Sequence, residues 1–167
     1  MLLIGDILEK HSARKLLTLT PENSLADGLE MMTRYNIHHL PIIEPGSNKD
    51  GSNGNLAGII SDRDLRLNTH SPLLYEGAEP HSPRHKKVDS LEQGIKDMLE
   101  TLQRHRIGEI MTKRVITLKE DDTALRAVTL MKEADISAIV IVKNENQVQD
   151  IVTRSDLMDV LLDFLKK

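Results

Sequence analysis

Two short segments of the chain place a hydroxyl residue three positions before a carboxylate, Ser61 before Asp64 and Thr153 before Asp156. Two β-branched apolar residues come directly before each hydroxyl residue. The pattern is typical of a buried strand that ends at a helix N-terminus. There, the hydroxyl and the carboxylate accept hydrogen bonds from backbone N–H groups that the helix leaves free. This helix-cap interpretation explains the spacing without any ligand.

The same strand-to-helix corner also has the chemistry of a binding site. A helix N-terminus offers backbone donors and the positive end of the helix dipole, which suit an anionic or polyhydroxyl ligand. A carboxylate beside it can accept hydrogen bonds from both hydroxyls of a ribose. One corner alone favours the helix cap, but two corners in the same sequence surroundings favour a binding function.

The surroundings of the two corners form an internal repeat. Residues 16–43 align with residues 115–142 at a constant offset of 99 positions. At the corner the offset is 92, from Asp64 to Asp156, because the first copy carries seven extra residues between its second and third expected strands. A period this long indicates a duplicated small domain rather than a solenoid.

The ordered set of motifs resembles the CBS domain family, named for cystathionine β-synthase, in which two tandem copies form a Bateman module. The matching segments are residues 109–112, 115–118, 40–43 and the two corners, and only a central segment at about 67–106 lies outside the resemblance. The run after the first corner and the helical insertion resemble the CBS pair of bacterial acetoin-utilisation proteins. We expect this chain to end without the further C-terminal domain of those proteins.

The resemblance implies an α/β (α+β) fold with two repeats of β-α-β-β-α type packed about a pseudo-twofold axis. We expect repeat 1 over residues 1–69, an inserted loop and linker helix over 70–106, and repeat 2 over 107–167. Expected strands are 16–19, 40–43, 115–118, 138–142 and 148–152, besides the strand that ends at Ser61. Expected helices are 4–10, 62–67, 122–134 and 154–165, together with one from a cap at Asn23 or Ser24 to about Tyr35–Asn36.

Helical spacing predicts the buried face of each longer helix. The expected buried positions are Leu25, Leu29 and Met32; Leu125, Val128 and Met131; and Leu157, Val160, Leu161 and Phe164. Residues 71–88 contain three prolines and are expected to be irregular. A helix from Ser90 to Arg106 then carries the stripe Leu91, Ile95, Met98, Leu99 and Leu102, which either packs on the module or forms a dimer contact.

Composition narrows the classes of function. The chain has 167 residues, no cysteine, two tyrosines, one phenylalanine and no tryptophan, so we expect an aliphatic core shared by two short repeats and a reducing, cytoplasmic setting. The net charge is −4 with both signs interspersed, which argues against nucleic-acid binding. No apolar run approaches the length of a bilayer-spanning helix, so no membrane association is expected.

Catalytic and metal-binding motifs are poorly supported. The sequence has no cysteine nucleophile, no glycine-framed serine, no His-Glu-x-x-His pair and no P-loop, so we do not expect an enzyme. His38 and His39 are adjacent in an expected strand, where neighbouring side chains point to opposite faces and cannot share one ion. Residues 44–55 lack the alternating carboxylates of a calcium loop and are expected to form a flexible hairpin loop.

The family resemblance implies two clefts that hold adenosine-containing ligands, with Asp64 and Asp156 each binding a ribose diol. By position, the phosphate would face Ser61 and Arg63 in the first copy and Thr153 and Arg154 in the second. The base would lie between Leu17, Thr18, His39 and Pro41 in the first copy and Ile116, Thr117, Ala138 and Val140 in the second. The second copy has Asp150 in place of Gly58, which adds negative charge, so the first cleft is expected to be the better site.

We therefore expect a regulatory module that senses AMP, ADP, ATP or S-adenosylmethionine and signals to an effector protein by a conformational shift. The resemblance also implies a homodimer, since relatives commonly pair into disc-like assemblies. The alternative is a ligand-free dimerisation or scaffold module in which both corners are only helix caps. No catalytic cofactor is expected in either case.

Overall fold

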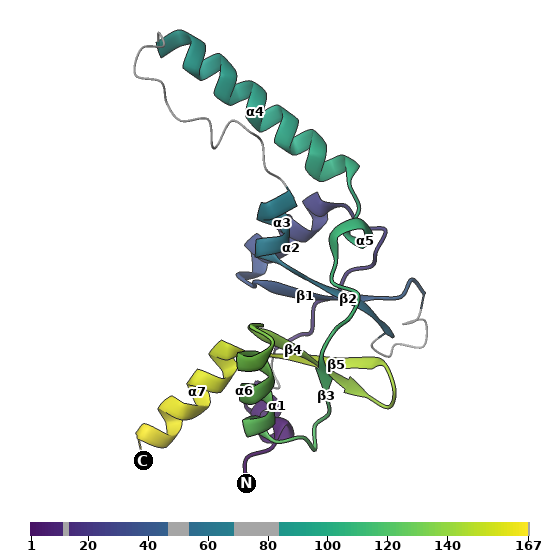
Figure 1. The fold of residues 1–167 in the computed structure, drawn as a ribbon, viewed down its shortest axis with the longest axis vertical. Helices are drawn as coiled ribbons and strands as arrows, with labels where there is room; N and C mark the ends of the chain where they lie inside the picture. The colour runs from purple at the N-terminus through teal and green to yellow at the C-terminus, as the bar shows by residue number, and fades with distance from the viewer. Residues whose placement is uncertain (12–13, 47–53, 69–83, 167) are drawn as a thin grey trace. The chain divides into compact units, whose positions relative to one another are not determined.

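The computed structural model describes residues 1–11, 14–46, 54–68 and 84–166, and it has mixed helix and strand content (Figure 1). In chain order the elements are α1 (Ile4–Lys10), α2 (Leu25–Tyr35), β1 (His39–Ile43), β2 (Leu56–Ser61), α3 (Asp62–Asn68), α4 (Arg84–Arg104), α5 (Ile107–Ile110), β3 (Thr117–Leu118), α6 (Ala124–Glu133), β4 (Ala138–Lys143), β5 (Gln147–Thr153) and α7 (Arg154–Leu165). The predicted α+β class is confirmed. Residues 47–53 of the loop predicted over 44–55, and most of the irregular segment predicted over 71–88, lie outside the described residues.

The chain forms two compact units that both draw on each half of the sequence. The first unit comprises Met1–Thr20, Pro41–Ile59 and Thr112–Lys167, and the second comprises Pro21–Leu40 and Ile60–Met111. The first unit contains a three-stranded sheet in the order β3-β4-β5, with β3 parallel and β5 antiparallel to β4. Helices α1, α6 and α7 lie on one side of this sheet (Figure 1).

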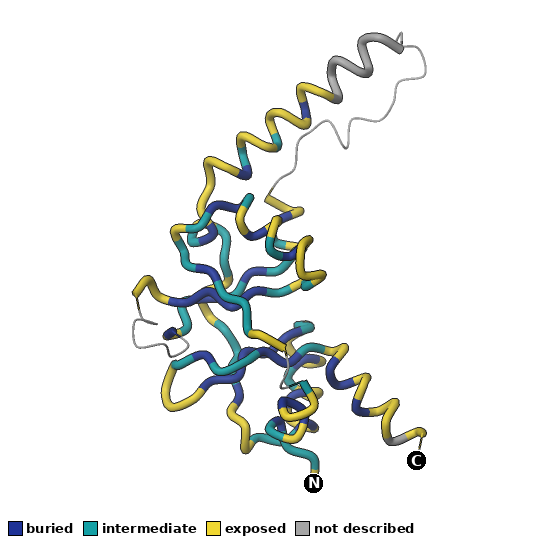
Figure 2. Tube along the Cα trace, turned by 180° about the vertical axis from the view of Figure 1, so that it is seen from behind, coloured by how far each residue is buried: buried dark blue, intermediate teal, exposed yellow. Residues whose placement is uncertain are grey.

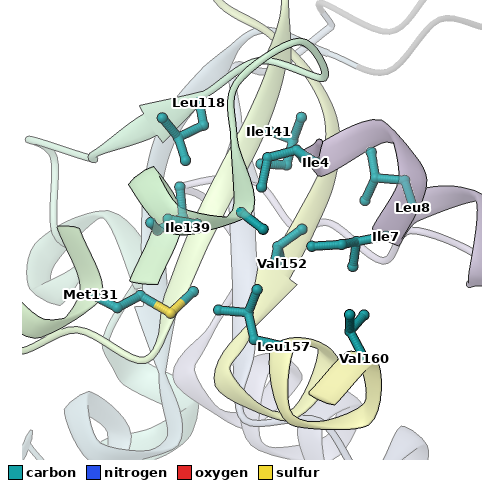
Figure 3. Close-up of a cluster of buried hydrophobic side chains, with 12 residues drawn as sticks. Ile4, Ile7, Leu8, Leu118, Met131, Ile139, Ile141, Val152, Leu157 and Val160 are labelled. Carbon is teal, nitrogen blue, oxygen red and sulfur yellow. The ribbon is translucent and has the colours of Figure 1, made fainter. Parts of the chain in front are cut away.

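The core of the first unit lies between that sheet and the three helices. Ile139 and Ile141 of β4 and Val152 of β5 are fully buried there, as their β-branched side chains favour (Figure 3). Ile4 and Ile7 of α1 complete the same cluster. Each such aliphatic side chain contributes about 1.5–3 kcal/mol when buried. The first helix of the chain therefore packs into the core of the second repeat.

The second unit shows the reciprocal exchange. Ile107, on the short helix α5 that begins the second repeat, is fully buried, and its N–H donates to the Asn23 carbonyl at 2.9 Å. The Gly108 N–H donates to the Pro21 carbonyl at 3.0 Å. A Cβ added at Gly28 of α2 would lie 3.5 Å from the Ile107 side chain, so α2 and α5 pack closely. Each half thus receives its entry helix from the opposite half of the sequence.

The predicted strand at 16–19 is wrong, because only Leu19 is paired there. The Leu19 N–H donates to the Pro41 carbonyl at 3.3 Å, and the Ile43 N–H donates to the Leu19 carbonyl at 2.8 Å. Continuing this parallel ladder by one step would require an N–H from residue 41, and proline has none. The second repeat has Val140 at the equivalent place, and there the strand β3 forms as a parallel partner of β4.

The predicted helix faces are only partly correct. Leu29, Val128 and Leu161 are exposed, and Leu125 is 75% exposed. The small residues Gly28, Ala124 and Ala127 are buried instead, because a helix lies closest to its neighbours where its side chains are smallest. Figure 2 shows exposed positions alternating with buried ones along α7. The expected burial of Phe164 lies outside the described side chains.

Helix α4 begins at Arg84, six residues before the predicted start at Ser90. Residues 84–90 contain neither glycine nor proline, so nothing in them stops the helix from extending backwards. Among the described side chains of its apolar stripe, Leu102 is buried and Met98 is partly buried, whereas Ile95 and Leu99 are exposed. The burial of Leu91 lies outside the described side chains. No helix in the described ranges has the length and hydropathy of a membrane span.

Candidate functional site

The first corner folds as a strand followed at once by a helix. Strand β2 ends at Ser61, and α3 begins at Asp62. The Ser61 N–H and hydroxyl both donate to Asp64 Oδ2, at 2.8 and 2.7 Å, and the Asp64 N–H donates to Ser61 Oγ at 3.2 Å. This reciprocal arrangement is a capping box, so the predicted cap is present.

The second corner repeats this geometry. The Thr153 N–H and hydroxyl donate to Asp156 Oδ2 at 2.7 and 2.8 Å, and the Asp156 N–H lies 3.4 Å from Thr153 Oγ1. In both corners one carboxylate oxygen is taken up by the cap. A binding function must therefore use the other oxygen, Oδ1.

The two Oδ1 atoms differ in their surroundings. Asp64 is partly buried, and its Oδ1 has no hydrogen-bond or ion-pair partner within the described residues. Asp156 is only 5% exposed, and its Oδ1 accepts from Arg14 Nη1 at 3.1 Å. His11 Nε2 lies 3.6 Å from the same oxygen. The first corner thus presents an open acceptor, and the second presents one that is already paired.

Arg14 is held at the second corner by more than Asp156. Its Nη2 donates to the Ile151 carbonyl at 2.7 Å and lies 3.5 Å from Asp150 Oδ1. The negative charge of Asp150, expected to disfavour a phosphate, is thus faced by a cation. Sequence reasoning missed Arg14 because it lies 142 positions from Asp156 in a short polar segment without periodicity. The repeat offers one sequence signal for Arg14: extending the offset of 99 pairs it with Lys113, so both copies have a basic residue at this position.

The sheet of the first unit brings most of the predicted second-cleft residues together. Thr117 pairs with Val140, and Ala138 pairs with Thr153, in the registers of β3-β4 and β4-β5. Ile116 immediately precedes β3 and is partly buried. Val140 is fully buried in a hydrophobic cluster with Ile43, Val142 and Val148. Its side chain is therefore turned into the core.

The side chain of Arg154, the first residue of α7, contacts residues just before β4. Its Nη2 donates to the Ile136 carbonyl at 2.9 Å and lies 3.7 Å from the exposed carboxylate of Asp135. The Arg154 backbone N–H donates to the Ser137 carbonyl at 3.0 Å. A role for this guanidinium at a phosphate stays a prediction, as do the roles of the other second-cleft residues.

The predicted first-cleft residues belong to both compact units. Leu17, Thr18 and Pro41 lie in the first unit, and Pro41 is buried there. His39, Ser61, Arg63 and Asp64 lie in the second unit, where the Arg63 side chain belongs to an exposed residue. Their joint role in one cleft stays a prediction.

His39 is the titratable group of the first corner whose pKa is perturbed. Burial lowers the pKa of His39, and the nearby Asp62 carboxylate partly opposes that shift. His38 lowers the pKa further, and Asp64 raises it. At neutral pH His39 is therefore uncharged and has one ring donor and one ring acceptor. Across the described ranges, no three metal-ligating side chains gather into a group that could hold an ion.

Comparison with known proteins places these corners in a family context. A sequence model of the CBS domain matches residues 4–69 and 107–163. A CBS domain-containing protein of Dictyostelium discoideum is 29% identical over 160 residues, which is 96% of this chain and 94% of the relative.

Three solved structures share the fold. CBSX2, solved in complex with AMP, has a TM-score of 0.65 at 18% identity, covering 100% of both chains. The CBS domain pair of protein MJ0100, solved with 5′-methylthioadenosine and S-adenosyl-L-methionine, has a TM-score of 0.61 at 23% identity, covering 99% of this chain and 98% of that one. A Vibrio cholerae protein of the acetoin utilization (AcuB) type has a TM-score of 0.66 at 19% identity, covering 99% and 94%. The predicted resemblance is confirmed by the family match and by this shared fold.

Proposed function

The chain belongs to the CBS domain family, and on that premise we propose that it is a regulatory module that binds an adenosine-containing ligand. Asp64 carries this proposal. One of its carboxylate oxygens fixes the helix cap, and the other has no partner within the described residues. An unpaired carboxylate oxygen at a helix N-terminus suits a ribose hydroxyl, which is a neutral donor. The CBS pairs solved with AMP and with S-adenosyl-L-methionine support the same ligand class.

The contacts follow the family pattern. In the first copy, Asp64 accepts from the ribose, while Ser61 and Arg63 face the phosphate. Leu17, Thr18, His39 and Pro41 border the base. Asp156, Thr153 and Arg154 have the corresponding roles in the second copy, with Ile116, Thr117, Ala138 and the backbone of Val140 around the base.

Signalling would occur by differential binding. A ligand that binds one arrangement of the module more tightly than another shifts the population towards it, and an effector protein that distinguishes the two arrangements reads the change. No catalytic step is involved. Such an effector protein must bind the two arrangements with different affinities.

We also propose that the module is a homodimer. Helices α6 and α7 of the first unit leave Leu125, Val128, Met158, Leu161 and Leu162 exposed. The two helices contact each other, and exposed apolar side chains on neighbouring helices are typical of an interface. The exposed apolar side chains equally favour the second candidate function, a ligand-free dimerisation scaffold. In a scaffold both corners would serve only as helix caps, and the hydroxyl and carboxylate of each corner already complete such a cap.

A thermal-shift screen separates these two functions. The protein would be heated with AMP, ADP, ATP, S-adenosylmethionine or NADH, alongside the variants Asp64→Ala and Asp156→Ala. A ligand at a hundred times its dissociation constant adds about 2.7 kcal/mol to the free energy of unfolding, which raises Tm by several degrees. We expect such a rise with at least one ligand and its loss in Asp64→Ala. A folded protein that responds to none of the five would instead be a scaffold.

A further inference from the structure

We propose that Arg14 gates the second corner, so that a ligand reaches Asp156 only when the Arg14 guanidinium leaves it. This inference rests on the proposed adenosyl-binding function and concerns which of the two corners is available. Arg14 lies in the first repeat but outside both corner motifs, and its contact with Asp156 makes the two corners unequal.

The Asp156 carboxylate has only one oxygen, Oδ1, that its helix cap does not use. Oδ2 already accepts two hydrogen bonds from Thr153, from its N–H at 2.7 Å and its hydroxyl at 2.8 Å. A carboxylate oxygen has about two lone-pair sites, so Oδ2 has no capacity left. Oδ1 is the remaining acceptor, and Arg14 Nη1 binds it at 3.1 Å. Because Asp156 is only 5% exposed, a ribose has little access to this oxygen beside the guanidinium.

Arg14 is held at the second corner by several contacts. Its guanidinium makes contacts with Asp156 Oδ1, the Ile151 carbonyl and Asp150 Oδ1 at 3.1, 2.7 and 3.5 Å. The charge of an arginine is permanent, so protonation chemistry does not release it. A ribose hydroxyl is a neutral donor and forms a weaker bond to a carboxylate than a guanidinium does. Ligand binding at this corner therefore requires breaking a charge-assisted contact first.

A second residue of the same part of the chain, His11, also lies beside Asp156. Helix α1 ends at Lys10, and its Ile7 and Leu8 are buried in the core of the first unit. His11 follows directly, with its Nε2 buried and 3.6 Å from Asp156 Oδ1. His11 and Arg14 therefore both lie beside Asp156 Oδ1, and His11 directly follows a helix that is packed in the core.

The equivalent residue of the second half does not form such a contact. Lys113, at the repeat offset of 99, is exposed and makes no ion pair with a described residue. Oδ1 of Asp156 is paired with Arg14, whereas Oδ1 of Asp64 has no partner among the described residues. A ligand should thus fill the first corner before the second, and removing Arg14 should make the second corner available.

Calorimetric titration of the full chain with AMP, and separately with S-adenosylmethionine, tests the gate. The proteins would be the wild type, Arg14→Ala, Arg14→Gln and the matched control Lys113→Ala. Losing a hydrogen bond to a charged group is worth about tenfold or more in affinity, so we expect the Arg14 variants to gain a second binding event or to tighten a weak one by about tenfold. We expect Lys113→Ala to bind like the wild type, and Asp156→Ala added to Arg14→Ala to remove the gain.

The outcomes separate the gate from the function. If the wild type binds either ligand, and folded Arg14 variants bind it equally or more weakly, the gate is overturned and the proposed function stands. If no protein binds either ligand, both are overturned. Arg14→Gln keeps a donor for the Ile151 carbonyl, so it provides a folded variant if Arg14→Ala is unstable.

Discussion

The ion pair between Arg14 and Asp156 should make the effects of substituting these two residues on the free energy of unfolding non-additive. We expect a double-mutant cycle of Arg14→Ala and Asp156→Ala to give a coupling free energy of about 1–2 kcal/mol in unfolding. Equilibrium urea unfolding of the four proteins, followed by far-UV circular dichroism, measures it.

The magnitude follows from burial rather than from distance. Arg14 Nη1 and Asp156 Oδ1 are 3.1 Å apart, with the two side chains 35% and 7% exposed. Exposed ion pairs contribute about 0.2–1 kcal/mol, and hydrogen bonds to charged groups with some burial contribute about 1.5–3 kcal/mol. A pair with one buried and one partly exposed partner lies between these ranges.

The same unit provides a control pair. Lys10 Nζ and Asp163 Oδ2 are closer, at 2.8 Å, but their side chains are 43% and 56% exposed. We expect a coupling free energy below about 0.5 kcal/mol for Lys10→Ala and Asp163→Ala, because solvent screens both charges. A coupling at Arg14 and Asp156 no larger than that of the control pair would refute the reasoning.

Three further predictions concern the fold and its response to pH. Gly5→Ala should stabilise the protein to urea by up to about 1 kcal/mol, because a Cβ there meets nothing closer than 3.5 Å, whereas Gly108→Ala should destabilise it, because its Cβ would lie 3.0 Å from Pro21. A reversed order would contradict this. Ile139→Ala should cost about 2–5 kcal/mol, since that side chain is fully buried, and a loss below about 1 kcal/mol would argue against the core described. Burial lowers the pKa of His39 below its usual 6.5, so near that pH the folded state binds fewer protons than the unfolded state. The free energy of unfolding should therefore fall as the pH drops through 6.5, and His39→Gln should weaken this dependence. Urea unfolding that is unchanged between pH 7.5 and 5.5 would contradict this prediction.

The corners could be predicted from sequence because their chemistry is local. A hydroxyl and a carboxylate three residues apart specify a capping box wherever a strand meets a helix, and Ser61 with Asp64 and Thr153 with Asp156 both form one. The left-handed end of α2 at Asn36, with φ 51°, was predictable for the same reason.

The remaining features depend on contacts that the sequence pattern does not encode. The missing strand before β1 follows from Pro41, whose lack of an N–H matters only once its pairing partner is known. Leu125 was expected to be buried because periodicity identifies an apolar stripe, but the buried side of α6 is set by the small Ala124 and Ala127. Arg14 contacts Asp156 across 142 positions of sequence, and neither corner motif specifies that contact.

The most direct test of the central proposal compares two capping carboxylates of the second unit. Asp27 forms the same box with Ser24 as Asp64 forms with Ser61, its Oδ2 accepting the Ser24 N–H at 2.8 Å. Each substitution by alanine should cost about 0.5–2 kcal/mol of stability through loss of the cap. In a calorimetric titration with AMP and with S-adenosylmethionine, Asp27→Ala is expected to bind like the wild type and Asp64→Ala to lose its first binding event. Equal binding by both variants would contradict the proposal and leave Asp64 as a helix cap alone.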